Sequence, residues 1–205
     1  MMLLRSAPPS PFGRKVLIAI SLLGFDGEVR IEAADTADPR DTVREQNPLG
    51  KIPVLIIEDG TAFYDSRVIL EYLDYRAGGN KIISRDAAKR FAALRLQALC
   101  DGILDASILL VYEGRWRAIE KHEPKWLDHQ SAKVVRALSV LESAPPTFPI
   151  GSELPDVGRI ALACALGYRD LRFGGDWRRD HPRLVAWLES FAARVPTFAA
   201  TTFTA

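Results

Sequence analysis

The chain has 205 residues, of which 48% are hydrophobic and 26% charged, the proportions of an ordinary globular protein rather than a disordered or fibrous one. Lys and Arg number 27 against 26 Asp and Glu, and no segment concentrates either sign, which argues against a nucleic-acid binder held by a basic face. Two cysteines exclude a disulfide framework, and the absence of any long apolar stretch or signal-like N-terminus predicts no membrane span and a cytoplasmic protein.

The placement of proline separates short elements from long helices. Six of the 13 prolines lie between Pro8 and Pro53, and none follows until Pro124, so long helices fit only after Pro53. Before that point the hydrophobic spacing predicts short elements in this order: a strand over 3–5, a helix over 11–23, a strand over 28–32, and a polar stretch over 35–47 that is helical only in part.

A β-hairpin is the clearest local pattern. The β-rich runs 54–57 and 62–64 are joined by the turn dipeptide Asp59-Gly60, and a helix with Asp65 as its capping residue follows. A helix between the first two strands makes that pair parallel, whereas a hairpin is antiparallel. The first part of the chain therefore predicts a mixed sheet with helices.

The rest of the chain predicts only helices. After the glycine-rich segment 78–81, the apolar periodicity indicates a long helix over 87–111. The run 160–166 is hydrophobic nearly all round, so its helix is expected at the centre of this part. That helix is predicted over 156–171. Two further helices are predicted over 126–141 and 182–194.

Ser10 stands directly before a helix with proline at its first position. It is either a simple N-cap, or a hydroxyl beside an anion site, because free N–H groups and the dipole at a helix N-terminus stabilise a thiolate and lower the pKa of a thiol. No G-x-S-x-G motif occurs, which argues against a serine hydrolase. Ser6, at the end of the first strand, and a backbone N–H are the alternatives to Ser10.

Two further segments have two interpretations each. Ile52-Pro53 at a strand start is either an ordinary turn or a cis bond that leaves the backbone of Ile52 free to pair with an extended peptide. Asp65-Ser66 is either a helix cap or a site for the charged end of a peptide.

These three segments together resemble the cytosolic glutathione S-transferase superfamily. The motifs are Ser-Pro-Phe, Asn-Pro-Leu-Gly-Lys-Ile-Pro-Val and Asp-Ser in that order, and the resemblance extends over essentially the whole chain, closest to bacterial, serine-type members related to the theta, zeta, beta and omega groups. It implies an α/β thioredoxin-like glutathione-binding domain over 1–78, a linker over 79–86, and an all-α helical bundle domain over 87–205.

The resemblance also assigns roles to single residues. Ser10 matches the residue that activates the thiol, and its being serine rather than cysteine argues against a mixed-disulfide mechanism. Tyr112, Arg115 and Trp116, near the end of the long helix, are candidates for an electrophile pocket or for interdomain packing. The glutathione contacts implied are those of Phe12, Lys51, Ile52, Pro53, Asp65 and Ser66, with Lys51 on the glycyl carboxylate, Ile52 on the cysteinyl backbone, and Asp65 and Ser66 on the γ-glutamyl group.

The resulting hypothesis is a detoxifying, homodimeric glutathione transferase. Glutathione is the co-substrate, the partner is a hydrophobic electrophilic small molecule, and no metal is expected because the three histidines show no ligand spacing. The alternatives are a glutathione-dependent isomerase or peroxidase on the same scaffold, and a non-catalytic interaction module. The sequence does not identify the electrophile.

Overall fold

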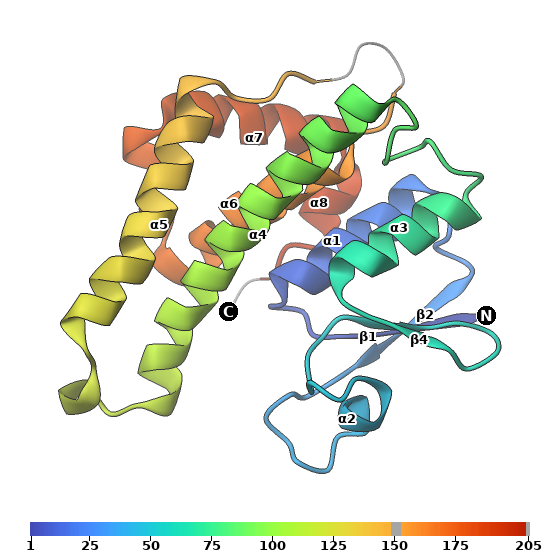
Figure 1. Cartoon of the computed structure of the whole chain (residues 1–205), viewed down its shortest axis with the longest axis horizontal. Coiled ribbons are helices and arrows are strands. Elements are labelled where there is room, and N and C mark those ends of the chain that lie inside the picture. The colour runs from blue at the N-terminus through green and yellow to red at the C-terminus, as the bar shows by residue number, and fades with distance from the viewer. Residues whose placement is uncertain (149–152, 204–205) are drawn as a thin grey trace.

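A computed structural model describes residues 1–148 and 153–203 of the chain. Its first part is a four-stranded sheet with helices α1 and α3 on one face and the short helix α2 on the other (Figure 1). The elements of this part are β1 (Met2–Ser6), α1 (Pro11–Leu22), β2 (Val29–Ala33), α2 (Val43–Gln46), β3 (Val54–Ile56), β4 (Ala62–Phe63) and α3 (Ser66–Arg76).

The sheet is mixed, as the connections predict. Its strand order is β2-β1-β3-β4; β1 runs parallel to β2 and antiparallel to β3, and β3 is antiparallel to β4. Leu4 pairs with Ile31 on one side and with Leu55 on the other. This order confirms the thioredoxin-like α/β part of the predicted fold class.

Helix α1 links the sheet to the rest of the molecule. Pro11 fits its first turn because the missing N–H has no intrahelical partner there, and Gly24, with φ +79°, lets the chain turn away after the last residue. Val16, Ala19 and Ile20 are buried. The helix packs against α3 and also against α6 from the second part, and one hydrophobic core continues through both parts.

The second part is entirely helical within the described residues. Helix α4 ends at Trp116, five residues after the predicted end, because no proline or positive-φ glycine interrupts it. The elements are α4 (Ala87–Trp116), the 3₁₀ turn η1 (Ile119–Lys121), α5 (Pro124–Ser143), α6 (Val157–Phe173), η2 (Arg178–Asp180), α7 (Pro182–Arg194) and α8 (Pro196–Ala200).

Helix α6 lies at the centre of this part, as its sequence predicts. Every side chain from Ala161 to Leu166 is fully buried, and α6 runs behind α4 in Figure 1. Asp156 caps it by accepting a hydrogen bond from the Arg159 N–H at 3.0 Å. Helix α8 was not predicted, because five residues are too few for a recognisable period. None of the described helices has an apolar stretch long enough to cross a bilayer.

Candidate active site

Ser10 caps helix α1 and keeps its hydroxyl proton free. Its backbone is extended, with φ −76° and ψ 115°, and its Oγ accepts a hydrogen bond from the Gly13 N–H at 3.1 Å. Within the described residues this is the only hydrogen bond of the hydroxyl, which therefore acts as an acceptor toward the helix. The same oxygen can donate its proton to an anion placed outside the first turn.

One backbone amide of the same turn is also free. Pro11 has no N–H, the Gly13 N–H is bonded to Ser10 Oγ, and the Arg14 N–H donates to the Ser10 carbonyl oxygen at 2.9 Å. Only the Phe12 N–H has no partner among the described residues. A hydroxyl and an amide therefore face the same small region at the positive end of the helix dipole.

Ser6 occupies a different environment. Its side chain is 4% exposed, and its Oγ has no hydrogen-bond partner among the described residues. A Cβ on Gly13 would lie 2.0 Å from that oxygen, so the hydroxyl is pressed against the back of α1. Because Ser6 does not line the cleft described below, it is not placed to contact a thiol there.

The loop before β3 exposes an unpaired backbone. The Ile52–Pro53 peptide is cis, and Ile52 has no hydrogen bond to any other described residue. The buried side chain of Asn47 holds the loop by donating to the Lys51 carbonyl oxygen at 2.9 Å and accepting from the Leu49 N–H at 3.1 Å. The loop thus presents Ile52 as a free edge for an extended peptide.

Asp65 and Ser66 form the N-terminus of α3. Asp65 accepts from the Arg67 N–H at 2.9 Å and pairs with the Arg67 guanidinium at 2.8 Å. Burial raises the pKa of Asp65, but these hydrogen bonds and the charge of Arg67 outweigh burial, so the pKa of the carboxyl is lowered overall. Asp65 is therefore a carboxylate at neutral pH, next to the buried Ser66.

A charged cluster joins α1, α3 and α4 beside this helix terminus. Lys15 Nζ is 2.5 Å from Asp101 Oδ1, and the two side chains are 0% and 8% exposed. Arg67 Nε lies 3.9 Å from the other oxygen of Asp101. Burial and the nearby charge of Asp101 raise the pKa of Asp105, one turn further along α4.

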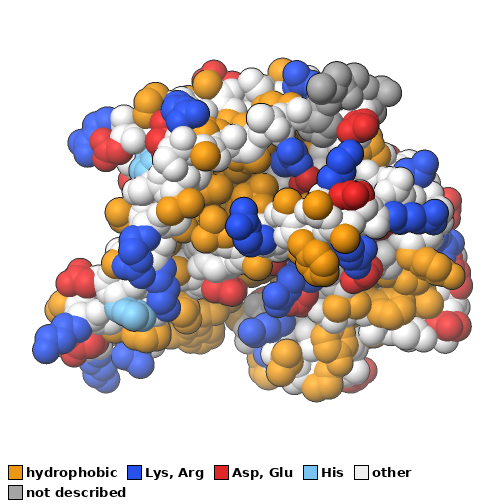
Figure 2. Space-filling model, turned by 45° about the horizontal axis from the view of Figure 1, so that its top comes forward, with side chains coloured by type: hydrophobic (Ala, Val, Ile, Leu, Met, Phe, Trp, Pro, Cys, Tyr) orange, Lys and Arg blue, Asp and Glu red, His pale blue; other side chains and the backbone are white. Residues whose placement is uncertain are grey.

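A cleft of about 550 Å³ opens between the two parts of the molecule, where Figure 2 shows an indentation between their lower ends. It brings the start of α1 and the loop before β3 opposite α4 and α6. The lining includes Ser10, Phe12, Lys51, Ile52, Tyr112 and Arg115 among the predicted residues, and also Thr36, Asp105, Ile108, Leu109, Tyr168 and Arg172.

Four predicted residues do not line this cleft. Trp116 is 65% exposed and lies outside it, because it is one position beyond Arg115 on α4 and faces another direction. Pro53 is buried. Asp65 and Ser66 lie at the terminus of α3, in the charged cluster that reaches the cleft through Asp105.

The lining of α4 had a recognisable signal, whereas that of α6 did not. Asp105, Leu109 and Tyr112 follow at intervals of four and three, which is the spacing of one helix face. Tyr168 and Arg172 are also one turn apart, but α6 is apolar on nearly all sides, so its sequence does not indicate which side faces the cleft.

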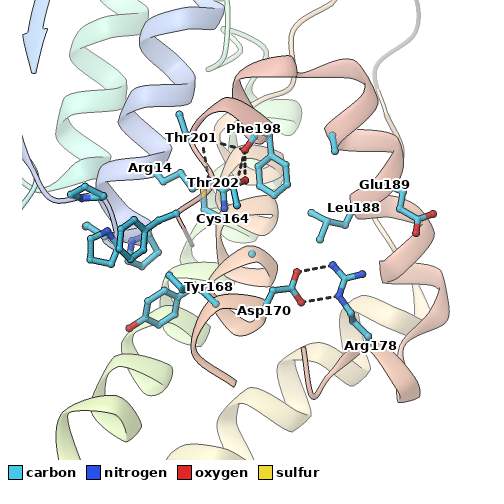
Figure 3. A pocket seen from close by; sticks show the side chains of 18 residues that line it. Arg14, Cys164, Tyr168, Asp170, Arg178, Leu188, Glu189, Phe198, Thr201 and Thr202 are labelled. Carbon is cyan, nitrogen blue, oxygen red and sulfur yellow. Dashed lines mark hydrogen bonds and ion pairs between the residues drawn. The ribbon is translucent and has the colours of Figure 1, made fainter. Parts of the chain in front are cut away.

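A second cavity of about 560 Å³ also borders Ser10 and shares Tyr168 with the cleft. Figure 3 shows that Arg14 points toward α8 there, where its guanidinium donates to the Phe198 carbonyl oxygen and to the hydroxyls of Thr201 and Thr202. The Asp170 carboxylate binds Arg178 through two hydrogen bonds of 2.8 and 2.7 Å. Asp170 and Arg178 therefore bind each other, whereas the guanidinium of Arg14 ties α8 to α1.

The two cysteines are not candidates for a nucleophile. Both are fully buried, and burial raises the pKa of the Cys164 thiol to about 12 and that of Cys100 still further. A thiolate, the reactive form, is therefore disfavoured at both. Neither cysteine therefore supplies a reacting group to the cleft.

Two sequence comparisons identify the family. A profile described as "Glutathione S-transferase, N-terminal domain" matches residues 4–81, and one described as "Glutathione S-transferase, C-terminal domain" matches residues 124–190. The chain belongs to the glutathione S-transferase family. It is 34% identical over 186 residues to the uncharacterized GST-like protein YibF of Escherichia coli (strain K12), covering 90% of this chain and 91% of that protein.

Solved structures agree with this assignment. A glutathione transferase family member from Pseudomonas fluorescens Pf-5 with bound glutathione is 41% identical, with a TM-score of 0.90 over 100% of both chains. A structure of a family member from the same strain with bound S-(propanoic acid)-glutathione is 42% identical, with a TM-score of 0.85 over 98% of this chain and 99% of that chain. The predicted family and fold class are thereby confirmed, and a relative in this family binds glutathione.

Proposed function

We propose that this protein is a glutathione transferase, which lowers the pKa of the glutathione thiol and directs the thiolate at an electrophile. The observation that carries the proposal is Ser10, whose hydroxyl caps α1 as an acceptor and keeps its proton for a sulfur in the cleft. A charge-assisted O–H···S⁻ bond together with the helix dipole favours the ionised thiol. Each pKa unit gained corresponds to about 1.4 kcal/mol.

Glutathione would lie along the first part of the molecule. Its cysteinyl backbone pairs with the unpartnered backbone of Ile52, and Lys51 contacts the glycyl carboxylate. The γ-glutamyl end reaches Asp65 and Ser66, where the lowered pKa of Asp65 keeps a negative charge for the α-ammonium group. The relative from Pseudomonas fluorescens contains bound S-(propanoic acid)-glutathione. This supports the proposal that the cleft also accepts a substituent on the sulfur.

The electrophile would bind on the opposite wall. We propose a glutathione domain over 1–78, a linker over 79–86 and an electrophile-binding helical domain over 87–205, a division that the family matches at 4–81 and 124–190 support. Catalysis would consist of ionising the thiol and holding it close to the reacting carbon. Ile108, Leu109 and Tyr112 supply an apolar and aromatic wall for that partner.

We also propose that the protein forms a homodimer through α3 and the start of α4. Val68, Glu71 and Tyr75 lie on one face of α3 at helical spacing, and Arg90 on α4 donates to Glu71 at 2.6 Å. Tyr75 and Phe91 are 78% and 68% exposed. Large exposed apolar side chains bordered by charged ones are typical of a protein interface.

Sedimentation can test the dimer. Phe91→Glu places a charge in the proposed interface and is expected to give a monomer, whereas Val140→Glu, at a similarly exposed position on α5, is expected to leave the dimer intact. A monomeric wild-type protein, or a dimeric Phe91→Glu variant, would contradict this interface.

Thiol titration tests the transferase proposal directly. The ultraviolet absorbance of the thiolate, followed against pH in the presence of the protein, is expected to show bound glutathione ionising at lower pH than free glutathione. A panel of a halonitrobenzene, a hydroperoxide and a maleyl compound then separates transferase, peroxidase and isomerase activity. A folded protein that binds no glutathione would instead be a non-catalytic module.

A further inference from the structure

The outer end of the cleft carries two guanidinium groups from different helices. Arg115 on α4 and Arg172 on α6 both line it, together with Tyr112 and Tyr168. Each arginine lies near a tyrosine about one helical turn before it. The Arg115 guanidinium is 5.3 Å from the centroid of the Tyr112 ring, and the Arg172 guanidinium is 6.0 Å from the centroid of the Tyr168 ring. The four side chains form one cluster, because the charges of Arg172 and Arg115 both act on the Tyr168 hydroxyl.

Neither arginine is neutralised within the described part of the chain. No carboxylate among residues 1–148 and 153–203 forms an ion pair with Arg115 or Arg172. The Nε of Arg172 is buried and has no hydrogen-bond partner there. This contrasts with the second cavity, where Arg178 is bound to Asp170 and Arg14 to α8. Arg172 is partly buried and Arg115 is exposed, and a partly buried guanidinium without a carboxylate beside it is expected to be matched by an anion.

Asp105, which also lines the cleft, lies too far from Arg115 to form an ion pair with it. Asp105 precedes Arg115 by ten residues on α4, which is about 15 Å along a helix. The charges acting on Asp105 are those of Asp101, Lys51, Arg67 and Lys15 at the other end of the cleft. The two ends of the cleft therefore differ in charge, and the end with Arg115 and Arg172 is positive.

We infer that the electrophile of this enzyme carries a carboxylate, which Arg172 and Arg115 bind while the thiolate attacks the carbon skeleton. The inference rests on the proposed transferase function and specifies its substrate class. A guanidinium donates two parallel hydrogen bonds to a carboxylate, and the tyrosine rings and Leu109 accommodate the apolar body between that group and the sulfur. The positive end also offsets the repulsion between a carboxylate and a nearby thiolate.

Binding of paired conjugates tests the inference without requiring turnover. The probes are S-(para-carboxybenzyl)glutathione and its primary amide, which differ in charge but hardly in shape, measured by titration calorimetry together with glutathione itself. Wild-type protein is expected to bind the acid about tenfold or more tightly than the amide, since hydrogen bonds to charged groups are the stronger ones. Arg172→Gln is expected to abolish this preference and Arg115→Gln to reduce it.

Two variants control for fold and for charge. Arg172→Lys keeps the positive charge without the planar fork and is expected to retain part of the preference. Arg136→Gln removes an exposed arginine of α5 that lies outside the cleft, and it is expected to behave as the wild type. All variants are expected to bind glutathione and the amide conjugate as the wild type does.

A kinetic comparison extends the test to the reaction. A chlorodinitrobenzoate and its primary amide both react by thiolate attack on the chlorine-bearing carbon: the C–S bond forms, chloride leaves with the C–Cl electron pair, and the thiol proton goes to solvent. For each substrate, kcat/KM is divided by the rate constant of the uncatalysed reaction. This ratio is expected to be higher for the acid than for the amide in the wild type, but not in Arg172→Gln.

The outcomes separate the inference from the function on which it rests. Equal affinity of the wild type for acid and amide overturns the inference and leaves the transferase proposal standing. A loss of affinity for glutathione itself in Arg172→Gln also overturns it, because the arginine would then bind the tripeptide. If the wild type binds neither glutathione nor the conjugates, the proposed function fails and the inference fails with it.

Discussion

At the scale of single residues, Ser10 has two separable tasks, capping a helix and stabilising a thiolate. Replacing it by alanine removes both, so Ser10→Ala is expected to lose about 1 kcal/mol of stability and about ten- to a hundredfold in kcat/KM, the equivalent of one hydrogen bond to a charged group. Glutathione affinity is expected to change little, because the tripeptide backbone is held elsewhere. Steady-state kinetics, calorimetric binding and urea unfolding measure the three quantities.

Glycine and threonine at the same position separate the two tasks. Glycine is nearly as good an N-cap as serine, so Ser10→Gly is expected to keep the stability but lose the activity, whereas Ser10→Thr retains the hydroxyl and is expected to keep both. If Ser10→Gly were fully active, the thiolate would be stabilised by the Phe12 N–H and the dipole alone.

Asp105 gives the cleft a pH-dependent effect on stability. Burial, followed by the charge of Asp101, raises the pKa of Asp105 above its ordinary value of 3.8, so the folded protein holds this proton more tightly than the unfolded chain. Its stabilising contribution is complete below pH 3.8 and is lost as the pH rises through the raised value. Asp105→Asn is therefore expected to be the more stable form at neutral pH, by no more than about 1 kcal/mol because the site is half exposed.

Unfolding by urea at several pH values checks this expectation. The stability difference between Asp105→Asn and the wild type should shrink as the pH approaches 3.8. The variant Asp128→Asn, at an exposed position on α5, serves as the control for removing a negative charge. A wild-type protein more stable than Asp105→Asn at neutral pH would mean that the ionised carboxylate is stabilised instead.

At the scale of elements, the contact between α1 and β1 depends on Gly13. Glycine lowers helix propensity, so Gly13→Ala alone would be expected to stabilise α1 by up to about 1 kcal/mol. The added Cβ, however, would lie 2.0 Å from Ser6 Oγ and 3.3 Å from its Cβ, and such overpacking typically costs about 1–3 kcal/mol. Gly13→Ala is therefore expected to destabilise the protein, and Ser6→Gly should restore much of the loss in a double-mutant cycle followed by thermal unfolding.

The elements themselves were largely predictable because their signals are local. Proline at the starts of α1 and α7, and the capping residues Asp65 and Asp156, indicate helix starts from a few neighbouring residues, and Asp59-Gly60 marks the hairpin. The late end of α4 and the short helix α8 were missed, because α4 has no stop signal and α8 is fixed by its contacts with α1. Likewise, only the folded structure shows that Gly13 is required by Ser6.

At the scale of the whole molecule, the site depends on contacts that no local pattern contains. The position of Ser10 before a helix and of Ile52 before a proline is evident in the sequence, and so is the face of α4 that carries Tyr112. The participation of Tyr168 and Arg172 is not, because it requires knowing how α6 is rotated against α4. The same holds for the pairing of Lys15 with Asp101, which lie 86 positions apart in the chain.

The pair of Lys15 and Asp101 joins the two parts of the protein through a buried contact. Since Lys15 is fully buried, Asp101→Asn would leave its charge without a carboxylate, and breaking a buried pair in this way costs about 3–5 kcal/mol. Lys15→Met combined with Asp101→Leu removes both charges and is expected to recover most of that loss. The exposed pair of Arg179 and Asp180, which lies outside the proposed dimer interface, is the matched control, because its loss in Arg179→Gln should cost less than about 1 kcal/mol.

Urea unfolding of the four proteins measures these differences at neutral pH. Because one hydrophobic core runs through both parts, the wild type and the double variant are expected to unfold in a single transition. Asp101→Asn should shift the whole transition to lower urea rather than split it, since α1 packs against α6 as well as against α3. A cost in Asp101→Asn as small as that in Arg179→Gln would mean that the buried pair contributes little and that the two parts are held together by apolar packing alone.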